Sequence, residues 1–263
     1  MEEIPTADWR GRAAPAGYAL AAGGVILGSW WLVVALGVFP TYVLPSPVSV
    51  FAVILEKPQA FGGPLLETLG TMALGASTGV VAGVSIGMLV HYLPRLGRVL
   101  YPTLVATQNV PIPVIAPILV LMLGYGLAPK IVVIALWIFF PIVINTAEGL
   151  RSTPVELVSF IRSLGGSRWQ VARHAELPSA LPSMFAAFRI AASYTVIAAV
   201  ISEWVSGETG LGSLMLRASL GFANPAVFAS LVLMIGAGIG VYLFVLALQR
   251  ILIPWHGDSG RAH

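Results

Sequence analysis

The sequence predicts an all-α polytopic membrane protein with six transmembrane helices. Hydrophobic residues make up 57% of the chain and charged residues only 10%, and the mean hydropathy is +0.90. Soluble domains carry about 25% charged residues, so this chain has too little charge to cover a water-facing surface. Its apolar stretches are long enough for helices to cross a hydrocarbon core. One membrane domain, residues 1–263, accounts for the whole chain.

The first span is predicted at residues 16–39, a run of 24 residues without a charge. Arg10 and Arg12 precede this run, as basic residues precede a signal peptide. The run is longer than the usual apolar region of about 7–15 residues in such peptides, which favours a retained helix. The other five spans are predicted at residues 66–90, 100–123, 131–150, 183–201 and 227–248.

Basic residues set the predicted orientation. Of the fourteen Lys and Arg residues, only Lys57, Lys130 and Arg217 fall in one alternating set of loops and helix ends; the other eleven are Arg10, Arg12, Arg95, Arg98, Arg151, Arg162, Arg168, Arg173, Arg189, Arg250 and Arg261. The positive-inside rule then puts both termini and segments 91–98 and 151–182 in the cytoplasm of a bacterium, with the spans in its inner membrane. This topology explains the net positive charge of the chain, so no nucleic-acid partner is expected.

Segments 40–65, 124–130 and 202–226 are therefore predicted to be external. In the first of them, Ser46 and Pro47 have the pattern of a helix N-cap and first helical residue. A short helix lying at the outer membrane interface is expected there.

The spans carry features that a plain lipid anchor does not need. Glycines recur every fourth residue along one face of the second span, which predicts close helix packing: Gly75, Gly79, Gly83 and Gly87. Four prolines interrupt the third span beside Gln108 and Asn109, which points to a translocation path, although the prolines could equally kink a helix and the amides bond a neighbour. The candidate pathway residues are Gln108, Asn109, Ser193, Tyr194, Thr195 and Glu203. Each could instead bond between helices, and Glu203 fits a structural carboxylate better than a proton carrier.

The segment between spans four and five is the most informative. Thr153 and Glu156 have capping-box spacing, with Pro154 at the first helical position, so a short amphipathic helix should begin there. Gly165-Gly166 should end that helix, because glycine readily takes the left-handed conformation. Ser167 and Gln170 form a second capping box, opening a helix that should stop before Pro178. Two short helices around a diglycine hinge predict a compact knob, residues 154–176, whose shape suits docking onto a soluble partner.

The knob resembles the cytoplasmic coupling loop of binding-protein-dependent ABC importer permeases. The resemblance rests on Leu164-Gly165-Gly166-Ser167-Arg168-Trp169-Gln170 and on Leu177-Pro178, with eleven residues between Gly165 and Leu177. Weaker matches, such as Leu44-Pro45-Ser46-Pro47 and Gly210-Leu211-Gly212, are similar to the nitrate, sulfonate, taurine and pyrimidine-precursor branch. The chain departs from the family pattern at Ser159-Phe160-Ile161, where the family has Glu-Ala-Ala, and at Ala175.

The resemblance implies a type I importer fold with cytoplasmic coupling helices. Two permease subunits, here a homodimer, would form the pathway, each docked on a cytoplasmic ATP-binding subunit, while an extracytoplasmic substrate-binding protein delivers the solute. ATP and Mg would be bound by the partner ATPase and no cofactor by this chain. The implied ATPase-coupling residues are Glu156, Ser159, Arg162, Leu164, Gly165, Gly166, Arg168, Trp169, Leu177 and Pro178. Arg162 and Arg168 could pair with acidic groups of the ATPase or with phospholipid headgroups.

The chain lacks the motifs of an enzyme. Neither lysine, Lys57 or Lys130, stands in a phosphate-binding G-x-x-x-x-G-K-[ST] loop, and the four histidines include no H-E-x-x-H metal motif. With no cysteine, a thiolate metal site is excluded as well. A non-catalytic permease subunit is therefore expected, and a secondary transporter or channel working without an ATPase is the alternative. The Ile253-Pro254-Trp255-His256 segment is similar to the pyrimidine-precursor and riboflavin permeases more than to the sulfonate permeases.

Overall fold

The computed structural model describes residues 14–107, 110–206 and 209–256. Within these ranges every regular element is a helix. The elements are α1 (Ala14–Ala35), α2 (Pro47–Glu56), α3 (Pro58–Tyr92), α4 (Pro94–Thr107), α5 (Ile112–Leu123), α6 (Leu127–Arg151), α7 (Val155–Ser163), α8 (Arg168–Val171), the π-helical turn η1 (Ala172–Glu176), α9 (Leu177–Ser206), α10 (Leu211–Leu220), α11 (Asn224–Leu252) and the short 3₁₀ turn η2 (Pro254–His256).

Four helical runs are long and apolar enough to cross a membrane: α3, α6, the continuous run from α8 through α9, and α11. They confirm predicted spans two, four, five and six. The predicted third span is present as two helices, α4 and α5, that meet at 100°; a pair bent in this way is either one broken span or a re-entrant loop. In α1, the stretch Ala21–Ala35 is apolar but shorter than the other spans, so the sixth crossing stays a prediction.

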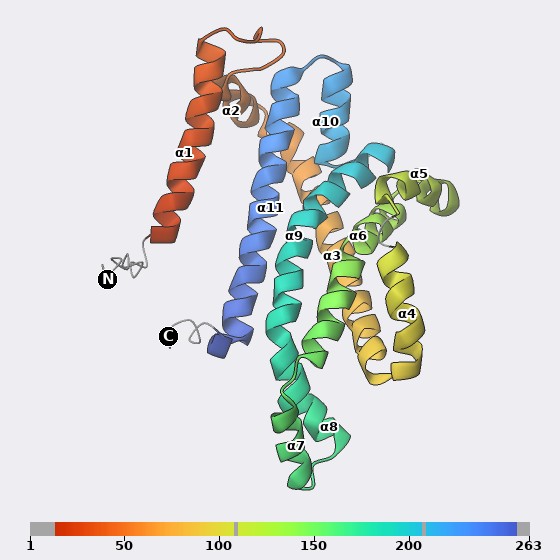
Figure 1. The fold of residues 1–263 in the computed structure, drawn as a ribbon. Coiled ribbons are helices and arrows are strands. Elements are labelled where there is room, and N and C mark those ends of the chain that lie inside the picture. The colour runs from red at the N-terminus through yellow and green to blue at the C-terminus, as the bar shows by residue number, and fades with distance from the viewer. Residues whose placement is uncertain (1–13, 108–109, 207–208, 257–263) are drawn as a thin grey trace, which may run out of the picture.

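The long helices stand side by side, and short helices extend from both ends of the bundle (Figure 1). The helices α7 and α8 project at one end, and α2 and α10 lie at the opposite end. Ser46 caps α2 as predicted, since the backbone N–H of Ser49 donates to the Ser46 Oγ over 3.1 Å. These two ends correspond to the predicted cytoplasmic and external sides of the chain.

The centre of the bundle is the contact of α6 with α3 and α9. Ile134, Ile138 and Ile142 of α6 are fully buried, and Ile138 and Ile142 pack against Ala187 and Ala191 of α9. Lipid tails are as apolar as these side chains, so helices in a membrane associate through close van der Waals contact. Small residues opposite large ones allow that contact.

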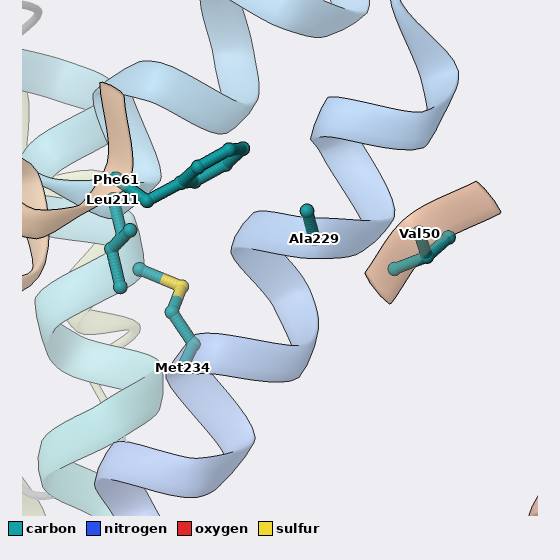
Figure 2. Packing of buried hydrophobic residues seen from close by; sticks show 5 residues of the cluster. All are labelled: Val50, Phe61, Leu211, Ala229 and Met234. Carbon is teal, nitrogen blue, oxygen red and sulfur yellow. The ribbon is translucent and has the colours of Figure 1, made fainter. Parts of the chain in front are cut away.

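A second apolar cluster lies at the α10 end of the bundle. Figure 2 shows Phe61 of α3, Leu211 of α10 and Met234 of α11 gathered on one side of α11, with Val50 of α2 on the other side. All four side chains are buried. The cluster joins α10 to three other helices and so fixes one side of this short helix.

Candidate functional site

The knob has the predicted glycine hinge. At the end of α7, Gly165 has a φ of +79°, its N–H donates to the Arg162 carbonyl over 2.9 Å, and the Gly166 N–H donates to the Ile161 carbonyl over 3.0 Å. This pair of bonds is the Schellman arrangement, which satisfies the last carbonyls of a helix and needs a left-handed residue. A Cβ on Gly166 would lie 2.5 Å from the Ile161 Cγ2, so both glycines are required, for different reasons.

Only one of the two predicted capping boxes forms. Ser167 Oγ accepts from the Gln170 N–H over 3.3 Å, and the Gln170 side chain accepts from the Ser167 N–H over 2.7 Å, which confirms the box that opens α8. The box predicted at Thr153 and Glu156 is wrong, because α7 is preceded by Pro154 without a side-chain cap. Thr153 lies two residues after the end of α6, and its hydroxyl donates back to the Leu150 carbonyl over 3.0 Å.

The helix that begins at Ser167 does not stop before Pro178, so that prediction is also wrong. The run Arg168–Ser206 is continuous and passes through the π-helical turn η1 into α9. In this turn the Leu177 N–H bonds to the Ala172 carbonyl, five residues back. A π-type turn inserts one residue into the hydrogen-bond ladder. That insertion lets the helix continue past a residue that has no N–H to donate.

The predicted coupling residues fall into two groups. Those on the surface of the knob are exposed: Glu156, Ser159, Arg162, Leu164, Gly165, Arg168 and Trp169. Gly166 in the hinge is half-buried, as are Leu177 and Pro178 at the base of the knob. The exposed surface includes large apolar side chains: Leu164 is 73% and Trp169 66% accessible, and Val155 and Phe160 are exposed as well. The knob therefore presents a mixed apolar and basic surface.

The base of the knob contacts the membrane-spanning helices. Glu176 Oε1 lies 3.7 Å from the His91 Nε2 at the end of α3. A cleft of about 470 Å³ separates the knob from the end of the chain and is lined by Pro154, Leu157, His174, Pro178 and Trp255, among others. Through these contacts the knob is joined to α3 and to α9.

The structure does not bring the predicted pathway residues together. Ser193 and Tyr194 lie on an exposed face of α9, whereas Thr195 is buried and its hydroxyl donates to the Ala191 carbonyl over 2.8 Å. Glu203 is fully buried and hydrogen-bonded, as expected of a structural carboxylate. Gln108 and Asn109 lie outside the described residues. In the described part of the chain, no group of three His, Asp or Glu side chains is placed to hold a metal ion.

Two buried polar residues were not singled out from the sequence. Thr68 of α3 is 1% exposed and Lys130 of α6 is 3% exposed, although Lys130 had been assigned to an external segment. Thr68 donates to Glu203 and Lys130 donates to Thr209. The position of Lys130 beside an apolar run could have predicted a buried partner for its ammonium group, because an unpaired charge is costly in such a run.

The chain is similar along most of its length to several proteins that are named as transport permeases. The chain is 33% identical over 226 residues to the formylaminopyrimidine transport permease protein ThiX of Halalkalibacterium halodurans, which covers 86% of this chain and 90% of that protein. It is 34% identical over 239 residues to the riboflavin transport system permease protein RibX of Chloroflexus aurantiacus, covering 89% of this chain and 88% of the relative. The taurine transport system permease protein TauC of Escherichia coli is 29% identical over 245 residues, with 89% and 88% covered.

The fold is similar to that of solved importers. An inward-facing structure of the methionine ABC transporter MetNI matches with a TM-score of 0.58 over 72% of this chain and 92% of the matched chain, at 23% identity. Residues 79–256 match the family model described as the binding-protein-dependent transport system inner membrane component. This match includes the knob and most of the membrane bundle. The chain therefore belongs to this family and is a multi-pass membrane permease subunit of an ABC importer.

Proposed function

We propose that the knob is the element through which this permease docks onto a cytoplasmic ATP-binding subunit. The observation that carries the proposal is the apolar and basic surface of α7 and α8, in which Leu164, Phe160 and Trp169 are exposed. Large apolar side chains gathered on a projecting element mark an interaction surface. ATP and Mg then belong to the partner subunit, and this chain contributes no catalytic group.

The proposed orientation places the knob end in the cytoplasm and the α10 end outside. Arg162, Arg168 and Arg173 lie on the knob, whereas Lys57 and Arg217 lie at the α2 and α10 end. This distribution follows the positive-inside rule. Both termini are then cytoplasmic, and an extracytoplasmic substrate-binding protein approaches from the α10 side.

Two copies of the chain are proposed to form the translocation pathway as a homodimer. The pathway candidates that a second copy could enclose are Ser193 and Tyr194, which lie on an exposed face of α9. Polar side chains at membrane depth normally face protein or a water-filled cavity rather than lipid. A small organic or anionic solute is proposed as cargo, of the pyrimidine-precursor or riboflavin type or of the sulfonate, taurine or nitrate type.

The proposed cycle has two states. ATP binding closes the pair of ATP-binding subunits and draws the two knobs together, which tilts the spans and opens the cavity outward; hydrolysis reverses the change. The direct contact between Glu176 and His91 supports transmission from the knob to α3. A secondary transporter, the alternative from the sequence, would need no such docking element.

Copurification tests the docking proposal. Phe160→Asp and Trp169→Ala each remove an exposed apolar side chain of the knob and should abolish capture of the ATP-binding subunit encoded with this chain. Phe222→Asp is the matched control, because Phe222 is 88% exposed, lies two residues after α10 and should not affect capture. Equal capture by all three variants would overturn the proposal. Uptake of labelled riboflavin and of labelled taurine by cells that express the complete system would then test the solute class.

A further inference from the structure

The residues on both sides of the break between α9 and α10 are buried. Ser202, Glu203 and Ser206 near the end of α9 are buried, as are Leu211 and Ser213 in the first turn of α10. The first backbone N–H groups of any helix have no partner within that helix. Where such groups are buried away from water, side chains from elsewhere must supply the partners.

Thr68 and Glu203 supply those partners. The Leu211 N–H donates to the Thr68 Oγ over 2.8 Å, and the Gly212 N–H donates to the Glu203 Oε2 over 2.6 Å. Thr68 in turn donates its hydroxyl hydrogen to the Glu203 Oε1 over 2.8 Å. The start of α10 is thus capped by one residue of α3 and one of α9, far apart in sequence, and a carboxylate at this position also complements the helix dipole.

The site is shaped around the carboxylate. Gly210, the residue before α10, has a φ of +104°, and a Cβ there would overlap the carboxylate group of Glu203. A Cβ on Gly212 would lie 2.9 Å from the Glu203 Oε2. The two glycines that flank Leu211 therefore allow the backbone to close directly on Glu203. The free space beside the two glycines, the positive φ of Gly210 and the hydrogen bonds to Glu203 therefore all fit a carboxylate at this position.

A buried cation holds the other side of the same turn. The Lys130 Nζ of α6 donates to the carbonyl and to the hydroxyl of Thr209, each over 3.0 Å. The Ser213 hydroxyl donates to the Glu203 carbonyl over 2.9 Å, which ties the turn to the α9 backbone as well. Burying a cation and a carboxylate is costly, and apolar side chains of similar volume often stabilise a fold as well or better. Packing alone does not account for this pair of charges.

We propose that Glu203 is a positioning residue for transport, which locks the start of α10 to α3 so that α3, α9 and α10 move as one body through the transport cycle. Glu203 touches neither the knob nor the exposed face of α9. Its role therefore goes beyond docking of the ATP-binding subunit and rests only on the transport function of the family. Without the lock, the knob would still move, but α10 would no longer follow α3.

Distance measurements in the assembled complex test this proposal. The chain has no cysteine, so spin labels can be placed at Leu66→Cys on α3 and Leu220→Cys on α10, both at exposed positions, with labelled copies diluted into unlabelled ones. The complex is measured in lipid nanodiscs, without nucleotide and with ATP and vanadate. The unaltered chain should give one narrow distance distribution that is the same in both states. A separate sample, labelled at Ser163→Cys alone in both copies of the complex, should change its knob-to-knob distance between the states and so report that the cycle proceeds.

Matched variants separate positioning from general stability. Glu203→Ala removes the partner of the Gly212 N–H, and Thr68→Val removes the partner of the Leu211 N–H. Each should widen the α3–α10 distribution about twofold, as local release of a helix end does. Thr68→Ser keeps the hydroxyl and should restore the narrow distribution. In the widened variants, ATP hydrolysis and the knob movement should persist, whereas a purely structural defect would lower both together with the yield of complex.

Several outcomes would overturn the proposal. One is an unchanged α3–α10 distribution in Glu203→Ala; another is a distance that already differs between the two states of the unaltered chain. A fall of hydrolysis in parallel with yield would also count against it. Failure of the docking proposal would appear differently, as a complex that lacks its ATP-binding subunits.

Discussion

Gly79 of α3 lies directly against Ile138 of α6: a Cβ added to Gly79 would stand 2.5 Å from the Ile138 Cγ1. The same relationship repeats along both helices at four-residue intervals. Gly75 faces Ile134, Gly83 faces Ile142 and Gly87 faces Thr146, each with a Cβ position within 2.7 Å of the facing side chain. The glycine face predicted from the sequence is therefore the face on which α3 and α6 approach most closely.

Two Gly→Ala substitutions in α3 should have opposite effects. Gly79→Ala should destabilise the solubilised protein by about 1–3 kcal/mol, because it overpacks a filled interface. Gly70→Ala, with nothing within 4 Å of the added methyl group, should be neutral or stabilising by up to about 1 kcal/mol, since alanine favours the helix. Thermal unfolding in detergent compares the two variants. Equal melting temperatures would contradict the packing seen here.

The requirement for glycine at position 165 is a matter of backbone conformation. Gly165 has a positive φ, and no atom of the chain lies within 4 Å of its Cβ position, so a side chain there would meet no steric clash within the chain. Gly165→Val should cost about 1–2 kcal/mol of local stability and reduce capture of the ATP-binding subunit. Gly165→Asn, which tolerates the left-handed region, should capture the subunit like the unaltered chain. Similar losses in both variants would mean that close approach by the partner requires the glycine.

The cap of α8 should be measurable by hydrogen exchange. Ser167→Ala removes the hydroxyl that accepts from Gln170 and should destabilise α8 by about 1 kcal/mol, with faster amide exchange in its first turn. Ser163→Ala is the control, because that hydroxyl only donates to the Phe160 carbonyl within its own turn. An exchange rate at α8 that does not respond to Ser167→Ala would show that the cap adds nothing there.

Cysteine labelling checks the orientation of the chain. Ser163→Cys on the knob and Leu220→Cys at the α10 end are single reactive thiols in a chain that has none of its own. In intact spheroplasts, a membrane-impermeant maleimide should label Leu220→Cys and should label Ser163→Cys only after the membrane is opened. The reverse pattern would place the knob outside and refute its docking to a cytoplasmic subunit.

Features that depend on nearby residues were predictable from the sequence. The Ser46 cap of α2, the Gly165 end of α7 and the Ser167 cap of α8 each involve residues within a few positions of one another. Local spacing also identified the glycine face of α3, because a helix repeats its faces at fixed intervals. The capping box at Thr153 had the same kind of support and did not form, because the residue at the N-cap of α7 is Pro154, which has no side chain that can accept a hydrogen bond.

Features that depend on distant residues were not predictable in this way. Thr68 and Glu203 are 135 positions apart, and nothing in the local pattern of either residue indicates that they share a bond. The continuation of the helix past Pro178 depends on a π-type turn, which has no simple sequence signature. The 100° angle between α4 and α5 likewise has no simple sequence signature, although the prolines indicated an interruption of the third span.

The unbroken run from Arg168 to Ser206 has a mechanical consequence. Its 39 residues extend about 58 Å along the helix axis, nearly twice the thickness of a hydrocarbon core. One end carries Trp169 and the other carries Glu203, so one helical run connects the knob with the start of α10. In the proposed cycle, a displacement of the knob would pass along this run to the far end of the bundle, with the π-type turn η1 and Pro182 as the points at which the run can bend.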